Sequence, residues 1–343
     1  MNRIELLEKL IAIRPALASS DLVPEYTHFW FYGLSVIACN DRIAISKPCK
    51  TDFAGALPGQ HLLGLISASG AKEVHFTMDK QDEVKLKLGG ANCKLAALPL
   101  KDLFQMPKPQ SDKRLFLDYQ DLKKALGHCM TAIVDDASGY AGVALVSKSD
   151  HISLYSSNGK ALVHAPVKCK NSNVKAILSE VFVKQLLSFI SEENPSLEIH
   201  ENYALFSTKE TVLWGRLLNP DAPSEFDATL TRILPANINK ASFKMPAAFR
   251  YAIDRAIVIL DHPSSDGYAE FDLQGSELII TSKSALGTVV DKIQDIEQDD
   301  IKTRFNPILL KVGCERFDRI LLTKGYAIIT DQTNVYIVVE SHQ

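Results

Sequence analysis

The sequence lacks the cysteine pairs, glycine-rich loops and long apolar runs that would place it at once in a chemical class. Its six cysteines stand singly, with no C-x-x-C pair and no histidine at zinc-finger spacing, so we expect buried reduced thiols and no metal. Neither common phosphate-binding glycine loop occurs, and there is no H-E-x-x-H helix or G-x-S-x-G turn. These absences leave no recognisable catalytic constellation, and we expect no cofactor.

A strong excess of charge of one sign is also absent. Lysine and arginine total 38 and aspartate and glutamate total 41, which gives a net charge of −3. The chain as a whole therefore does not attract nucleic acid, and any DNA contact must come from a local patch. The N-terminus lacks the apolar core of a signal peptide, and no stretch approaches the roughly 20 apolar residues of a membrane span. We expect a cytoplasmic protein with no membrane partner.

A few short motifs remain as candidates for chemistry. Three acidic pairs in predicted loops, each interpreted as solvated loop charge, are Asp135-Asp136, Glu192-Glu193 and Asp299-Asp300. Gly89-Gly90 is interpreted as a hairpin turn. An enzyme stays open as an alternative only because catalytic residues can be dispersed along a sequence.

The length of 343 residues exceeds that of a usual single domain, and an internal repeat accounts for it. Between Leu57 and Leu98, apolar residues at helical spacing are followed by three strand-like runs separated by turns. The same order of one helix and three strands recurs at 178–218 and at 305–340. Each of these segments therefore predicts one helix packed on an antiparallel sheet.

The intervening segments repeat this pattern. Helices are predicted at Arg3–Ile13, Tyr119–Met130 and Ala247–Leu260, and three strand-like runs follow each of them. Two such halves make one domain. The absence of strict helix–strand alternation indicates the α+β class and not a doubly wound parallel sheet.

The repeat predicts three tandem domains, at 1–111, 112–236 and 237–343. Linkers are expected where proline and charge interrupt the pattern, around Gln105–Arg114 and around Ile233–Ser242. Each domain is expected to contain two halves of one helix and one antiparallel sheet.

The predicted helices carry the candidate DNA contacts. The basic residues on their expected inner faces are Arg3, Lys9, Arg14, Lys123, Lys124, Lys184, Arg250, Arg255 and Lys311. Acidic residues occur on the same helices, so each helix taken alone is better explained as a solvated face. Repetition of this basic character across three domains would favour contact with a polyanion.

Four stretches in order along the chain carry a family resemblance. They are GGANCKLAALPLKDLFQMP at the end of the first domain, SSNGKALV in the second, ILP at Ile233–Pro235, and RFNPILL in the third. In this order and spacing they resemble the bacterial beta-type DNA sliding clamps, the beta subunits of DNA polymerase III. The resemblance extends over nearly the whole chain.

The resemblance implies three tandem DNA-clamp domains in a head-to-tail homodimer, with helices lining a ring and sheets outside. Double-stranded DNA would pass through the ring without sequence-specific contacts, because tight contacts would stop the sliding. The implied function is that of a processivity factor for DNA replication, which is not an enzyme and which tethers the replicative polymerase.

The resemblance also implies two apolar surfaces. One is a groove that binds polymerase and clamp-loader tails, at Leu154, Ser157, Gly159, Lys160, Leu162, Pro235, Ile337 and Val339. The other is the dimer interface, where the first domain's last strand meets the first helix of the partner's third domain, which places Leu115 and Leu117 against Val258 and Ile259. These four residues are equally well explained as core within a domain.

The sequence departs from the family at two places in this groove. Lys160-Ala161 replaces the usual His-Arg, and the usual Met-Pro-Met-Arg-Leu ending is replaced by Val339-Glu340-Ser341-His342-Gln343. A divergent, phage-encoded clamp in the host cytoplasm would account for both. The alternative function is a monomeric clamp-fold adaptor or decoy that binds such tails without encircling DNA.

Overall fold

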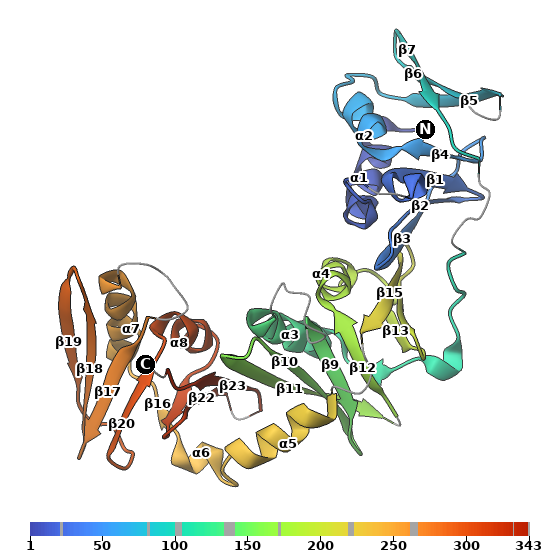
Figure 1. The fold of residues 1–343 in the computed structure, drawn as a ribbon. Coiled ribbons are helices and arrows are strands. Elements are labelled where there is room, and N and C mark those ends of the chain that lie inside the picture. Colours follow the sequence, from blue (N-terminus) through green and yellow to red (C-terminus); the bar gives the residue numbers. More distant parts are fainter. Residues whose placement is uncertain are drawn as a thin grey trace. The chain divides into compact units, whose positions relative to one another are not determined.

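The protein was analysed as a computed structural model, which describes residues 1–20, 23–80, 83–99, 105–133, 141–170, 173–218, 223–260, 267–331 and 333–341. The chain forms two compact units, one of Met1–Leu115 with Val181–Leu217, the other of Phe116–Glu180 with Leu218–Gln343. Figure 1 shows that both units combine helices with antiparallel strands. The acidic pair Asp135-Asp136 lies outside the described residues, as do His342 and Gln343. The three domain boundaries stay a prediction.

The six helices predicted from the repeat are confirmed. They are α1 (Arg3–Ile13), α2 (Gly59–Ser67), α3 (Tyr119–Cys129), α4 (Glu180–Phe189), α7 (Ala247–Ile259) and α8 (Pro307–Cys314). Three of them begin at a side chain that accepts backbone N–H bonds of the first turn: Asn2, Asp118 and Asn306. Such caps satisfy donors that the helix itself leaves without partners. The sequence therefore defines these helix starts locally.

Every predicted strand-like run is also a strand. In the first unit these are β1 (His28–Tyr32), β2 (Ser35–Cys39), β3 (Ile43–Pro48), β5 (Val74–Lys80), β6 (Glu83–Leu88), β7 (Ala91–Ala96), β13 (Ser196–Ile199), β14 (Tyr203–Ser207) and β15 (Val212–Leu218). In the second unit they are β9 (Gly142–Ser147), β10 (His151–Ser157), β11 (Ala161–Lys170), β17 (Ala269–Gln274), β18 (Glu277–Ser284), β19 (Gly287–Ile293), β21 (Arg319–Leu322), β22 (Tyr326–Thr330) and β23 (Val335–Val339). The turn between β6 and β7 is formed by Gly89, whose φ of +59° suits glycine.

Five short strands were not predicted. They are β4 (Gly55–Pro58), β8 (Phe116–Leu117), β12 (Lys175–Ser179), β16 (Phe243–Lys244) and β20 (Ile301–Phe305). Each directly precedes one of the helices, so five of the six halves consist of a short strand, a helix and three strands, and before α1 Asn2 forms only a single bridge with Glu73. Runs of two to five residues are too short to show a period of two in the sequence.

The interpretation of Glu192 as solvated loop charge is wrong. Its carboxylate accepts bonds from Lys47 Nζ at 3.0 Å, Thr208 Oγ1 at 2.5 Å and Thr211 Oγ1 at 2.7 Å. Lys47 is itself buried and lies over the Phe189 ring. The network joins β3 to the segment that follows α4 within the first unit, and a buried lysine of this kind needs such a partner.

The second unit contains two sheets. One has the strand order β16-β21-β22-β23-β11-β10-β9-β12, and the other has the order β19-β18-β17-β20. Helices α3 and α8 lie on one side of the larger sheet, and α5 (Pro223–Ile233) and α6 (Ile238–Ala241) lie on the other (Figure 1). Gly313 allows α8 to lie close to the sheet, because a Cβ there would be 2.6 Å from Ile329 and 2.7 Å from Tyr336. The segment predicted as a linker around Ile233–Ser242 is therefore partly helical.

Candidate functional site

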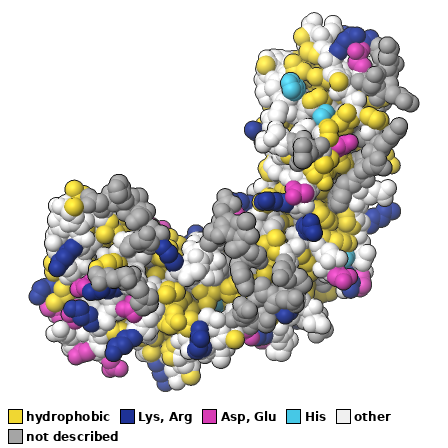
Figure 2. Space-filling view, viewed as in Figure 1, with side chains coloured by type: hydrophobic (Ala, Val, Ile, Leu, Met, Phe, Trp, Pro, Cys, Tyr) yellow, Lys and Arg dark blue, Asp and Glu magenta, His cyan; other side chains and the backbone are white. Residues whose placement is uncertain are grey.

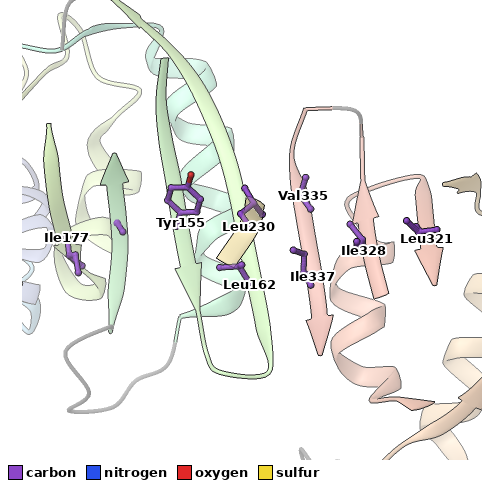
Figure 3. Close-up of a cluster of buried hydrophobic side chains, with 9 residues drawn as sticks. Tyr155, Leu162, Ile177, Leu230, Leu321, Ile328, Val335 and Ile337 are labelled. Atoms are coloured by element: carbon purple, nitrogen blue, oxygen red, sulfur yellow. The ribbon is translucent and has the colours of Figure 1, made fainter. Parts of the chain in front are cut away.

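The candidate site is the apolar face of the larger sheet in the second unit. Leu162 of β11 is the register partner of Ile337 on β23, which in turn faces Ile328 on β22. Leu321 on β21 is the next residue in this row, being the register partner of Ile328. Figure 3 shows these side chains on neighbouring strands. Alternation along the strands places them all on one face.

Helix α5 covers this face. Its Leu230 is buried in the same cluster, and Ile233, Leu234 and Ile238 pack against it from the end of α5 and the start of α6. Phe226, one turn before Leu230, stacks on Tyr155 with 5.8 Å between ring centroids and an angle of 7°. The cluster is thus enclosed between the sheet and α5.

Asp227 connects α5 to the sheet through two polar contacts. Its carboxylate accepts a hydrogen bond of 2.7 Å from the Tyr155 hydroxyl and pairs with the Lys148 ammonium. The bond from Lys148 lowers the pKa of Asp227, so this carboxylate is ionised at neutral pH. Burial raises the pKa of Tyr155, which therefore acts as a neutral donor. These bonds fix the position of α5 over the apolar face.

His164 also stacks on the Tyr155 ring. The two rings stack at 4.9 Å, and His164 Nε2 lies 3.1 Å from Ser153 Oγ. Burial lowers the pKa of His164 to about 4, so the imidazole is neutral at pH 7. It acts here as a buried aromatic ring and not as a cation.

One rim of the apolar face is the turn between β10 and β11. Gly159 has a φ of +78°, and the Ser157 hydroxyl accepts the Gly159 N–H at 3.2 Å and donates to Ala161 O at 2.9 Å. Lys160 follows with an exposed side chain, and its carbonyl accepts the N–H of Val339 at 2.9 Å. The turn and the end of β23 therefore form one continuous rim.

The C-terminal segment is held beside this rim by Glu340. Its carboxylate accepts bonds from the Thr303 hydroxyl at 2.8 Å, the Arg304 N–H at 3.2 Å and the Gly325 N–H at 2.8 Å. This residue stands where the resembling family has part of its Met-Pro-Met-Arg-Leu ending. The different ending is thus bonded to β20 of the smaller sheet and to the turn between β21 and β22 of the larger sheet.

The predicted groove residues fall into two groups. Leu162, Ile337, Val339, Lys160, Gly159 and Ser157 lie on the apolar face or at its rim, and Pro235 is exposed between α5 and α6. Leu154 is fully buried, and its register partner Ala165 places it on the opposite face of the sheet. Leu154 therefore does not line this surface.

The other seven buried residues of the cluster were not predicted from the sequence: Ala144, Tyr155, Ile177, Leu230, Leu321, Ile328 and Val335. The available signal was the period of two along each strand: Ser157 and Leu162 imply Tyr155 on the same face, and Ile337 implies Val335. No comparable signal existed for Leu230, because α5 itself was not predicted.

The predicted interface residues are placed differently from one another. Leu115 is only 4% exposed and donates its N–H to Leu197 O at 2.8 Å, and Leu117 lies in β8, paired with Cys169 of β11. Both are engaged within the chain. On α7, by contrast, Val258 is 80% exposed and Ile259 is half-buried. The last described strand before Leu115 and β8 is β7 (Ala91–Ala96), which has only β6 as a sheet neighbour among the described strands.

The predicted DNA-facing residues differ in what they contact. Lys9 pairs with Glu5 at 2.5 Å, Arg255 with Asp291 at 2.6 Å and Lys311 with Asp254 at 2.8 Å. Arg3 donates to the carbonyls of Ala71 and Ile66, and Arg250 donates to that of Phe317. The exposed remainder of the set is Arg14, Lys123, Lys124 and Lys184.

A polar cavity of about 930 Å³ lies beside β20 and is one candidate for an enzymatic site among the described residues. Several of its charged residues have partners within the unit: Arg304 pairs with Glu270, and Asp300 accepts the Gly275 N–H at 2.7 Å. Figure 2 shows basic and acidic side chains lying side by side over this part of the unit. The cavity contains no histidine or cysteine, and no group of residues in the described part of the chain has metal-ligand geometry.

Comparison with solved structures identifies the fold. A DNA polymerase sliding clamp from Bacillus subtilis superposes with a TM-score of 0.86 at 16% identity, covering 100% of this chain and 98% of that one. A beta sliding clamp from Caulobacter crescentus gives 0.87 at 14% identity with the same coverage. The chain has the sliding-clamp fold.

The likeness to sliding clamps lies in the structure alone. The DNA polymerase III beta subunit of Thermotoga maritima gives a TM-score of 0.81 at 16% identity, covering 100% of this chain and 98% of that one. No protein-family model matches the sequence, and no curated protein matches it. The α+β class and the clamp architecture are therefore confirmed. Among the described residues, no helix is long and apolar enough to cross a membrane.

Proposed function

We propose that the protein is a DNA sliding clamp that encircles duplex DNA as a homodimeric ring and binds a polymerase tail at the rim of the apolar face, beside α5. The observation that carries this proposal is the likeness of the whole chain to solved sliding clamps. The proposed location is the cytoplasm in which replication takes place.

Two free sheet edges support ring closure. β7 ends the sheet of β5-β6-β7, and β19 ends the sheet of the second unit. Both edges alternate between exposed and half-buried residues along their length. Exposed edges of this kind pair readily with another chain. The exposed apolar side chains of Val290 on β19, Leu286 just before it and Val258 on α7 add a hydrophobic contact. We place the interface at β7 of one protomer and β19 with α7 of its partner.

The apolar face supports tail binding. At its rim, Pro235 and Lys160 are exposed, and Leu162 and Val339 beside them are the candidate contacts for the apolar anchors of an extended peptide. Lys160 at the rim and Glu340 at the tail distinguish it from the resembling family. We infer that it binds its own polymerase's tail more tightly than tails suited to that family's usual ending.

The test is retention on DNA of different topology. Protein assembled from dissociated subunits on a nicked circle should remain bound at moderate salt, because a closed ring has no end to leave from. After one restriction cut it should be lost rapidly. Loss at equal rates from circle and cut DNA would contradict enclosure.

A monomeric variant supplies the matched control for this assay. Ile259→Asp places a charge in the proposed interface and should abolish retention on circles. If the wild type already runs as a monomer at micromolar concentration, the ring is wrong and the adaptor that binds tails without encircling DNA takes its place.

A further inference from the structure

Helices α7 and α8 present a mixed-charge surface centred on Asp254. Asp254 lies one turn after Arg250 on the exposed side of α7, since Ala252, Ile253 and Ala256 form the buried side. On α8, Lys311 reaches across so that its Nζ lies 2.8 Å from Asp254 Oδ1. The Lys311 and Asp254 side chains are 44% and 49% exposed, so solvent and ions reach the pair.

The Asp254 carboxylate acts on more than one cation. Its hydrogen bond is the main cause of the raised pKa of Lys311. The pKa of Arg255 is raised chiefly by Asp291, and Asp254 adds to this effect. Glu315 lies 3.9 Å from the Lys311 ammonium. The Asp254 carboxylate thus lies near three basic residues proposed to face DNA, namely Arg250, Arg255 and Lys311.

We propose that Asp254 competes with DNA phosphates for Lys311 and so limits how tightly this surface holds the duplex. The inference rests on the proposed function, because it takes α7 and α8 as DNA-facing helices. A carboxylate and a phosphate are alternative acceptors for the same ammonium group. A DNA phosphate that binds Lys311 therefore displaces the Asp254 carboxylate. It does not bind to an ammonium group that lacked a partner.

This exchange has a consequence for movement along DNA. The favourable free energy of each phosphate contact is offset by the loss of the Lys311–Asp254 pair and by repulsion between the carboxylate and the DNA backbone. Release of the phosphate restores that pair. The contact is therefore weak at every position, and the difference in free energy between neighbouring positions stays small.

Asp254→Asn tests the competition, because it removes the charge and preserves the shape of the side chain. Its affinity for a short linear duplex at low salt should rise about two- to fivefold, the range expected when an exposed ion pair is changed. The plot of log affinity against log salt should steepen by about 0.9 for each additional phosphate that the variant neutralises. An unchanged affinity and slope would overturn the inference.

Two controls separate this effect from a general change in net charge. Glu193→Gln makes the same charge change at the exposed pair with Lys209, 2.9 Å apart and outside the helices that carry the candidate DNA contacts. It should leave the affinity near the wild-type value, and an equal rise would contradict the competition. Adding Lys311→Ala to Asp254→Asn should remove the rise in affinity, and a rise that persists would also contradict it.

The circular-DNA assay distinguishes failure of this inference from failure of the clamp function. Asp254→Asn should remain on circles like the wild type and leave the cut form more slowly. If the wild type leaves circles as fast as cut DNA, the clamp function itself is wrong. If the wild type is retained and Asp254→Asn behaves like Glu193→Gln, only the role of Asp254 is wrong.

Discussion

Leu154 and Leu162 lie on neighbouring strands, β10 and β11, and their side chains point to opposite faces of the sheet. They form a matched pair for testing the tail-binding surface. Leu162→Ala should weaken binding of an extended polymerase-tail peptide by about tenfold, as loss of an apolar anchor contact does. Leu154→Ala should lower the free energy of unfolding by about 2–5 kcal/mol and leave the affinity of the folded protein unchanged. Calorimetry measures the affinity, and denaturant titration measures stability; equal affinities of the two variants would contradict this assignment.

His164 gives the protein a specific dependence on pH. Burial lowers its pKa from 6.5 to about 4. Between these values the unfolded chain binds a proton that the folded chain does not, so the free energy of unfolding falls as the pH drops through this window. The full difference corresponds to about 3 kcal/mol. Denaturant midpoints of His164→Gln between pH 7 and pH 4 should fall less than those of the wild type, whereas substitution of the exposed His61 should leave the wild-type dependence intact.

At the level of elements, α7 carries the apolar residues that are most exposed for association. Val258→Asp should yield a folded monomer, because the side chain is 80% exposed and an unpaired charge is costly in an interface. Light scattering measures the mass of the variant in solution, and circular dichroism shows whether the variant is folded. Leu34→Asp is the matched control: Leu34 is 67% exposed at the β1–β2 turn, and this variant should remain a dimer. A dimeric Val258→Asp would move the interface elsewhere.

Local chemistry explains which elements could be predicted from the sequence. Helices such as α1 and α3 have a capping side chain at the start and buried residues at helical spacing, so their bounds were predicted to within about a residue. Strands of five residues or more show their alternation directly. Helix α5 has its apolar residues on one face too, but residues 223–232 lie between the repeat segment that ends at 218 and the linker expected around Ile233–Ser242, and no element was predicted there.

The site was predictable only in part, because its composition depends on which strands become neighbours. Leu162 and Ile337 are 175 residues apart in the sequence and meet through the pairing of β11 with β23. The resemblance placed both in one groove, whereas the side chains of Tyr155 and Leu230 became part of it only once the register and α5 were known. The contacts of Leu115 and Leu117 within the chain likewise became visible only once the pairing of β8 with β11 and the bond from Leu115 to Leu197 were known.

At the scale of the whole molecule, the repeated half explains how one chain of this length could form part of a ring. Each half contributes one of the six predicted helices and an antiparallel set of strands, and the sheet edges at β7 and β19 remain for pairing with a second copy. The ring is proposed to hold DNA by enclosure, so the net charge of −3 does not oppose the function. Contacts such as Lys311–Asp254 then affect how easily the ring moves along DNA, whereas enclosure determines whether it stays bound.

The distribution of thiols gives this protein a natural position for a fluorescent label. Five of its six cysteines are buried, and burial raises the pKa of Cys39, Cys129 and Cys314 to about 12, so they form little thiolate. Cys93 alone is partly exposed, in the middle of the edge strand β7. A maleimide dye should therefore attach at one position without any engineered cysteine. Because that position lies on the edge proposed to close the ring, the dye's emission would report opening of the ring and exchange of subunits in real time.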